Sequence, residues 1–187
     1  GELPKEVTLV AVSKTKPISD LQDAYDAGQR VFGENKVQEM CAKWEQLPKE
    51  IDWHFIGHLQ RNKVKYLAPF VDLIHGVESF RLLKEINKQA IKHNRIIDVL
   101  LQFFIANEET KFGLSFEEAQ SILSDENFKE LKNVRICGVM GMASFSNNQE
   151  QIREEFKTLK NIFDKLKFTF FDNETSFNVV SMGMSGD

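Results

Sequence analysis

Cysteine and proline are scarce in this chain of 187 residues, which holds two of the first and four of the second. Two cysteines, Cys41 and Cys137, cannot build the disulfide framework of a small secreted domain, so we expect free thiols in a reducing cytoplasm. No apolar run has membrane-spanning length, and residues 1–6 lack the apolar segment of a signal peptide. No Pro/Gly/Ser-rich linker divides the chain, so residues 1–187 are predicted to form one domain.

The charge pattern gives little support to a polyanionic partner. The formal net charge is -4 and the sequence pI is about 5.7, with acidic and basic residues interleaved. A nucleic-acid-binding surface needs a basic stripe or patch, and none is visible. The charge pattern therefore argues against nucleic acid as a partner.

What the chain does have is a regular alternation of apolar strands and amphipathic helices. The predicted strands cover residues 7–13, 30–33, 51–57, 71–76, 98–106, 134–142 and 178–182. The predicted helices cover residues 19–28, 35–46, 60–68, 80–94, 115–123 and 148–166. Several strands are apolar on successive residues, as parallel strands covered on both faces are.

Strict βα alternation leaves two architectures, a TIM-type (β/α)8 barrel or an open, flavodoxin-like sheet. The first strand is followed by Lys14-Thr15-Lys16-Pro17, where a dinucleotide-binding sheet would carry G-x-G-x-x-G. Polar and glycine-containing motifs recur at the carboxyl ends of successive strands, where a barrel gathers its site. We therefore predict the barrel, with its eighth strand missing from a chain that we expect to be a truncated form of a longer one.

Lys14 is the candidate reactive group, because it stands where the first strand opens into a loop. A primary amine in that place can form a Schiff base with a carbonyl cofactor. A lone lysine after a strand is usually a solvated surface residue, and the same holds for Lys16 and for Lys111 in the loop after the fifth strand. The choice among them needs further signals.

Four motifs supply those signals. They read A-V-S-K-T-K-P from residue 11, F-G-E-N-K-V-Q-E from residue 32, W-H-F-I-G-H-L-Q-R-N-K from residue 53 and S-M-G-M-S-G-D from residue 181. In this order and spacing they resemble the pyridoxal-phosphate homeostasis protein family, and the resemblance covers essentially the whole chain.

The resemblance implies a barrel related to the amino-terminal domain of alanine racemase, binding pyridoxal 5'-phosphate (PLP) as an aldimine. The position that matches the Schiff-base lysine is Lys14. By the same match, Asn35 and His54 lie near the cofactor ring, and Ser181 lies at the phosphate with the backbone of Met182 and Gly183. Members of the family have a helix before the first strand and a last helix and strand carrying G-S-T-x-V-R-I-G, and these are missing here.

Three functions stay open at this stage. The first is PLP binding and delivery without turnover, as part of intracellular vitamin B6 homeostasis, with PLP-dependent apo-enzymes as recipients. The second is an amino-acid racemase, which needs a second acid/base opposite the lysine; the tyrosines, Tyr25 and Tyr66, fall on predicted helices. The third is a Schiff-base aldolase, in which the lysine usually comes from a later strand. We favour the first, in a monomer with no catalytic residue, and we expect no metal, since His54 and His58 flank a strand end.

Overall fold

The computed structural model describes residues 8–106 and 112–184. Its centre is one parallel sheet of seven strands in the order β1 to β7. The strands are β1 (Ala11–Val12), β2 (Val31–Glu34), β3 (Asp52–Phe55), β4 (Leu73–Val77), β5 (Ile97–Phe103), β6 (Val134–Ala143) and β7 (Val179–Met184). Neighbours in sequence are neighbours in the sheet, as in a βα barrel.

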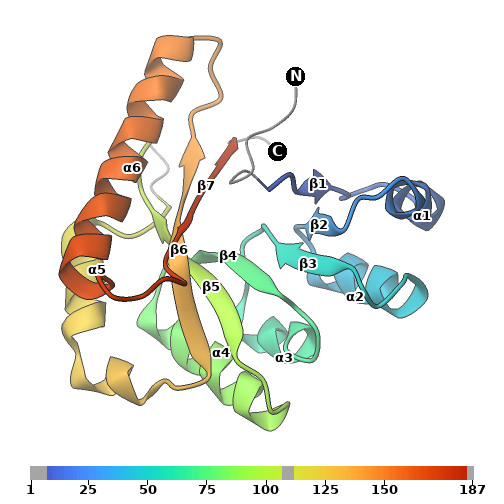
Figure 1. Ribbon diagram of the computed structural model, residues 1–187, viewed down its shortest axis with the longest axis horizontal. Coiled ribbons are helices and arrows are strands. Elements are labelled where there is room, and N and C mark those ends of the chain that lie inside the picture. The colour runs from blue at the N-terminus through green and yellow to red at the C-terminus, as the bar shows by residue number, and fades with distance from the viewer. Residues whose placement is uncertain (1–7, 107–111, 185–187) are drawn as a thin grey trace.

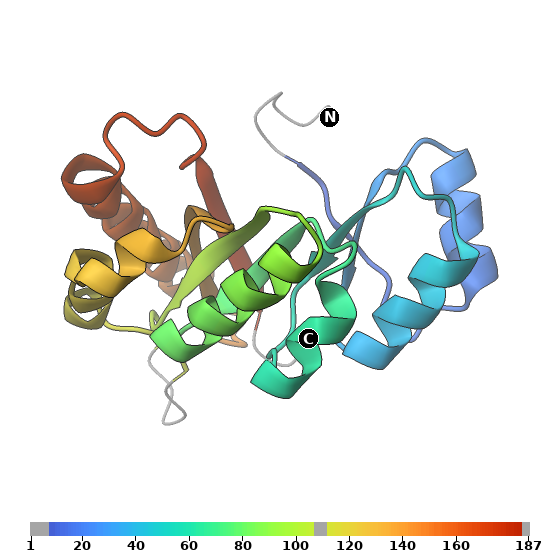
Figure 2. The ribbon, with the colours of Figure 1, turned by 90° about the horizontal axis from the view of Figure 1, so that it is seen from below.

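The helices lie on the outer, convex side of this curled sheet (Figure 1 and Figure 2). They are α1 (Ile18–Asp26), α2 (Val37–Gln46), α3 (Val64–Leu67), α4 (Phe80–Lys92), α5 (Phe116–Ser124) and α6 (Gln149–Phe170), with 3-10 turns η1 (Arg61–Lys63) and η2 (Glu126–Glu130). Strands β1 and β7 form the two edges of the sheet in the described residues, so the structure is a partial TIM-type barrel.

The sheet is buried on both faces, which explains the apolar runs in its strands. All five residues of β4 are buried, and so are most of those in β5. The larger core fills the space between the strands and the helices and includes Trp53, Phe32 and Phe55. A smaller cluster of Leu73, Leu100, Cys137 and Met140 is completed by half-buried Met142 and Val179.

Gly138 permits the close approach of β6 and β7. The register between β5 and β6 shifts at Val99 and Leu100, which pair with Ile136 and Gly138. Gly138 has a φ of 156°, and a Cβ there would lie 1.8 Å from the carbonyl oxygen of Val179. Any side chain at this position would push β7 away, so the glycine and the bulge together place the last strand.

The structure confirms the predicted barrel class and all seven predicted strands, with shifted ends. Val7, the first residue of the predicted strand 7–13, lies outside the described residues, and among residues 8–13 only Ala11 and Val12 pair with β2, so this strand is shorter than predicted. The helix predicted at 60–68 is divided into η1 and the single turn α3, and η2 was not predicted. Among the described residues, no helix combines the length and apolar character needed to cross a membrane.

Candidate functional site

The carboxyl ends of the parallel strands lie at one end of the sheet, and Lys14 and Asn35 are placed there. Lys14 follows β1 and Asn35 follows β2, and the N–H of Ser13 donates to the carbonyl of Gly33 at 2.9 Å, which joins the two strand ends. The next strand end continues the row, because Gly57 packs on Asn35. A Cβ on Gly57 would lie 2.4 Å from the Asn35 carbonyl oxygen, so glycine is required at that contact.

Three lysines near this edge have different surroundings. Lys14 is half-buried and has no hydrogen bond or ion pair within the described residues, whereas Lys16 is exposed. Lys43 is buried and fully bonded. Lys111, the remaining candidate, lies outside the described residues. Of these lysines, Lys14 is therefore the one that is partly shielded from water and has no partner among the described residues.

Lys14 sits in a tight turn whose backbone is unusual. The N–H of Lys16 donates to the carbonyl of Ser13 at 3.1 Å, which closes the turn around Lys14 and Thr15. Thr15 has a φ of 62°, in the left-handed region. A β-branched residue rarely adopts this conformation, and strain of this kind costs on the order of 1–3 kcal/mol. Other contacts must hold the turn in this shape.

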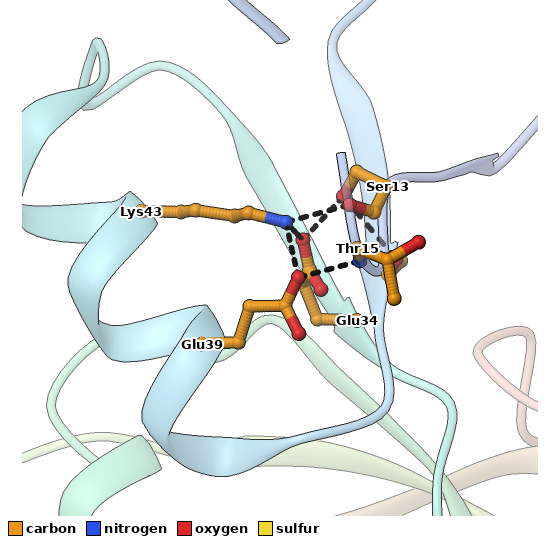
Figure 3. Close-up of polar contacts among 6 residues, drawn as sticks. Ser13, Thr15, Glu34, Glu39 and Lys43 are labelled. Carbon is orange, nitrogen blue, oxygen red and sulfur yellow. Dashed lines mark hydrogen bonds and ion pairs between the residues drawn. The ribbon is translucent and has the colours of Figure 1, made fainter. Parts of the chain in front are cut away.

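A polar cluster under the turn supplies these contacts (Figure 3). We call it the Lys43 cluster; its members are Ser13, Thr15, Glu34, Glu39 and Lys43. Lys43 Nζ donates to the carbonyl of Ser13 at 2.6 Å, to Glu34 Oε1 at 2.6 Å and to Glu39 Oε1 at 2.8 Å. Ser13 Oγ also donates to Glu34 Oε1 at 2.6 Å, and the N–H of Thr15 donates to Glu39 Oε1 at 2.6 Å.

The pKa values of the two glutamates of the Lys43 cluster are shifted in opposite directions. Burial raises the pKa of Glu34, and the hydrogen bonds from Lys43 and Ser13 oppose that shift. The hydrogen bond from Lys43 lowers the pKa of Glu39, whose side chain is one-quarter exposed, at 25%. Glu39 is therefore the carboxylate of the cluster that stays ionised most readily.

His54 belongs to a second polar chain, which crosses the inner face of the sheet. His54 Nδ1 lies 3.0 Å from His75 Nε2, and His75 Nδ1 lies 2.9 Å from Ser181 Oγ. At the other end, His54 Nε2 is 3.4 Å from Asp52 Oδ1, an ion-pair distance that is long for a hydrogen bond. The structure thus connects two predicted residues, His54 and Ser181, through His75.

His75 is uncharged at neutral pH, because burial first and nearby His54 second lower its pKa to about 3. A neutral imidazole has one N–H and one acceptor nitrogen. If Nδ1 carries the proton, it donates to Ser181 and leaves the serine hydrogen free for an anion. If Nε2 carries it, Ser181 donates to His75 instead. The position of this proton decides whether Ser181 can donate to a bound anion.

Met182 and Gly183 follow Ser181 in β7, and both are half-buried. A Cβ on Gly183 would lie 2.9 Å from the sulfur of Met142, so the backbone is packed closely there. The rest of the S-M-G-M-S-G-D motif, residues 185–187, lies outside the described residues. No hydrogen bond in the described part of the chain joins Lys14 or Asn35 to Ser181.

A polar groove of about 600 Å³ lies at the carboxyl ends of β3 and β4. Its lining includes His58, Arg61, Gly76, Glu78 and Arg81. Side chains of both charges line this groove, which therefore differs from the mostly apolar pockets that bind small molecules. In the part of the chain that the structure describes, no group of three His, Cys, Asp or Glu side chains could hold a metal ion.

The sequence pattern missed the Lys43 cluster and the role of His75. A local signal for the cluster was present, because Glu39 and Lys43 are four residues apart on a helix and Lys43 shares a face with Met40. The bond between His75 and Ser181 has no such signal, since 106 residues separate the two. Only the order of the strands brings them together.

The fold is a partial TIM-type barrel with a lysine, Lys14, after its first strand. Comparison with known families shows to which class of proteins this barrel belongs. The family model for the alanine racemase N-terminal domain matches residues 2–187. The pyridoxal phosphate homeostasis protein of Aquifex aeolicus is 39% identical over 180 residues, covering 96% of this chain and 77% of the relative. That of Escherichia coli K12 is 34% identical over 191 residues, with 100% and 79% covered. The chain belongs to the pyridoxal phosphate homeostasis proteins, within the alanine racemase N-terminal domain family.

Solved structures agree with this placement. PipY of Synechococcus elongatus without PLP has a TM-score of 0.85 at 26% identity, over 98% of this chain and 92% of PipY. PipY with PLP bound has a TM-score of 0.83 at the same identity and coverage. Alanine racemase of Clostridium difficile has a TM-score of 0.73 at 14% identity, over 98% of this chain and 49% of the racemase. The last similarity shows the fold alone.

Proposed function

We propose that this chain binds PLP through Lys14 and serves intracellular PLP homeostasis, holding the cofactor reversibly and without turnover. The observation that carries the proposal is that Lys14, at the mouth of a partial barrel, is half-buried and has no hydrogen bond or ion pair with residues 8–106 or 112–184. PipY, which shares the fold, has been solved with PLP bound, and curated relatives are named for PLP homeostasis.

The side chains at this edge fit such a ligand. When bound, PLP supplies an aldehyde that reacts reversibly with a primary amine. Lys14 supplies that amine, and the turn of residues 13–16 fixes where it leaves the backbone. Ser181 can donate to a phosphate oxygen when His75 donates to Ser181. We also propose that Asn35 lies at the ring and that the backbone of Met182 and Gly183 lies at the phosphate.

The absence of turnover is part of the proposal, and it rests on the tyrosines. Racemisation requires a second acid/base on the opposite face of the substrate. Tyr25 lies on α1 and donates to Glu50 at 3.2 Å, and Tyr66 lies on α3. Neither follows a strand of the sheet directly, so neither is placed to serve as that group. The two free thiols, Cys41 and Cys137, fit the reducing cytoplasm that we propose as its location, with PLP-dependent apo-enzymes as recipients.

The test is a titration of the purified protein with PLP, followed by visible absorbance. We expect a saturable band that borohydride removes in the wild type and in Lys16→Ala, and that is absent in Lys14→Ala. The folded state of Lys14→Ala is checked by circular dichroism. An unchanged band in Lys14→Ala would refute the assignment of Lys14, and D-alanine formed from L-alanine in proportion to protein would refute the absence of turnover.

A further inference from the structure

The Lys43 cluster is more elaborate than packing of α2 requires. All three N–H groups of the Lys43 ammonium have an acceptor, at 2.6, 2.6 and 2.8 Å, and the residue is 4% exposed. A buried ion pair of this kind contributes little net stability compared with apolar residues of the same volume, because both charges lose their hydration. Net stabilisation of the fold therefore does not explain why the Lys43 cluster is present.

Its contacts converge on the two residues that flank Lys14. Lys43 donates to the carbonyl of Ser13, just before Lys14, and Glu39 accepts from the N–H of Thr15, just after it. The same oxygen, Glu39 Oε1, receives both the Lys43 ammonium and the Thr15 N–H. Helix α2 thus holds the backbone of the Lys14 turn on both sides (Figure 3).

These contacts matter because Thr15 has a φ of 62°, which lies in the left-handed region. A β-branched residue leaves that region unless its backbone is held there. Release of Thr15 would rotate the peptide that follows Lys14 and change the direction in which the lysine side chain starts. The Glu39 bond opposes that rotation.

We propose that Glu39, oriented by Lys43, is a positioning residue that fixes the Lys14 turn and so aims the Lys14 amine at the cofactor aldehyde. This inference rests on the proposed function, since it gives the Lys43 cluster a role only if Lys14 is the cofactor lysine. The gain is one of orientation: an amine held near its target reacts more completely than one that samples many directions.

Glu39 is the residue to change, because loss of Lys43 would leave the fully buried Glu34 carboxylate without its cation and endanger folding. Glu39→Ala removes the acceptor for Thr15. Glu39→Gln keeps an amide oxygen that can accept from both Thr15 and Lys43, and so serves as the conservative rescue. Glu45→Ala is the matched control, since it removes the same charge from an exposed position of α2.

Two measurements are made on each variant at a temperature well below unfolding. The first is hydrogen exchange of the Thr15 amide without cofactor, by nuclear magnetic resonance. The second is the dissociation constant for PLP from the visible band. In Glu39→Ala we expect faster exchange at Thr15 and PLP binding weakened about tenfold, the scale of one hydrogen bond to a charged group. Glu39→Gln and Glu45→Ala are expected to stay within about threefold of the wild type.

The outcomes separate this inference from the proposed function. Glu39→Ala that binds PLP as the wild type does, while the wild-type adduct maps to Lys14, overturns the positioning role and leaves the function standing. Equal weakening in Glu39→Ala and Glu39→Gln also overturns it, because the Thr15 acceptor would then be irrelevant. A wild-type protein with no adduct at Lys14 overturns both.

Discussion

Lys14 and Lys43 both lie near the carboxyl ends of the strands, but their side chains have different surroundings. Lys43 has an acceptor for each of its N–H groups, and Lys14 has none within the described residues. The three hydrogen bonds of the Lys43 ammonium tie it to the cluster, whereas a primary amine without such contacts can approach a carbonyl group. These surroundings support the proposal that Lys14 is the cofactor amine and that Lys43 holds the structure around it.

Ser181 gives a prediction at the residue scale. Ser181→Ala should weaken PLP binding by about 1–3 kcal/mol, the range for a lost hydrogen bond to a charged group. It should weaken unphosphorylated pyridoxal much less, because pyridoxal lacks the phosphate. Calorimetric titration with both ligands measures the difference. Equal weakening of the two would mean that Ser181 serves the inner histidine chain and not the phosphate.

Single residues were predictable where a local sequence motif marks them, and were not predictable where their contacts join strands that are far apart in the sequence. Lys14 was singled out because it stands where the first strand ends, and Asn35, His54 and Ser181 were assigned through the motifs that resemble the family. The sequence does not show where His75 points, because its bond to Ser181 depends on the placement of β4 and β7 in one curled sheet. The cofactor roles of the four motif residues stay predictions.

Glu155 shows how an element secures the loop that follows a strand. It lies on α6 and is 5% exposed, and its oxygens accept from Ser144 N at 2.8 Å and Ser144 Oγ at 2.6 Å. Ser144 directly follows β6, at the same edge of the sheet as Lys14. A carboxylate from an outer helix therefore holds a strand end here, as Glu39 does at Thr15.

Glu155→Ala should lower the free energy of unfolding by about 1–3 kcal/mol, because the buried N–H of Ser144 would lose its acceptor. Glu154→Ala, which removes an exposed partner of Lys157 on the same helix, should change it by no more than about 0.5 kcal/mol. Urea unfolding curves of the two variants and the wild type make the comparison. Similar losses in both variants would contradict the role given to Glu155.

The elements themselves were predictable where periodicity was strong. Strand β5 and helix α4 were predicted to within a few residues, because their apolar patterns run over many positions. Strand β1 was predicted too long, since it is an edge strand and pairs only through Ala11 and Val12. The sequence shows where the apolar run lies, but it does not show how many of its residues form hydrogen bonds with the neighbouring strand.

The two ends of the strands usually have different roles in βα barrels: residues at the carboxyl ends form the ligand site, and residues at the amino ends stabilise the fold. The carboxyl ends of the strands gather Lys14 and its turn. The amino ends carry an acidic pair, in which Asp72 accepts from the N–H of Trp53 at 2.7 Å. Burial first, and the neighbouring Asp52 after it, raise the pKa of Asp72 to about 6. This end should affect stability more than ligand binding.

Asp72 should make the stability of the whole molecule fall as the pH rises. A carboxyl whose folded pKa is raised favours folding fully below its unfolded pKa, near 3.8, and loses that contribution as the pH passes about 6. The interaction with His54 lowers the pKa of Asp52 below its usual value of 3.8, so the stability contributed by Asp52 is lost only at more acid pH.

Between pH 4 and pH 7, the free energy of unfolding of the wild type should therefore drop relative to Asp72→Asn by about 2–3 kcal/mol. Asparagine keeps an oxygen for Trp53 and does not titrate. Urea unfolding at several pH values measures the drop, with exposed Asp23→Asn as the control. A constant difference over this range would contradict a raised pKa at Asp72.

Mapping of the reduced adduct tests whether Lys14 is the cofactor amine. The wild-type protein is saturated with PLP, reduced with borohydride, digested and analysed by mass spectrometry. The account predicts one stoichiometric pyridoxyl group, on the peptide that contains Lys14. An adduct on Lys16 or Lys111 with Lys14 unmodified, or label spread evenly over the surface lysines, would contradict it.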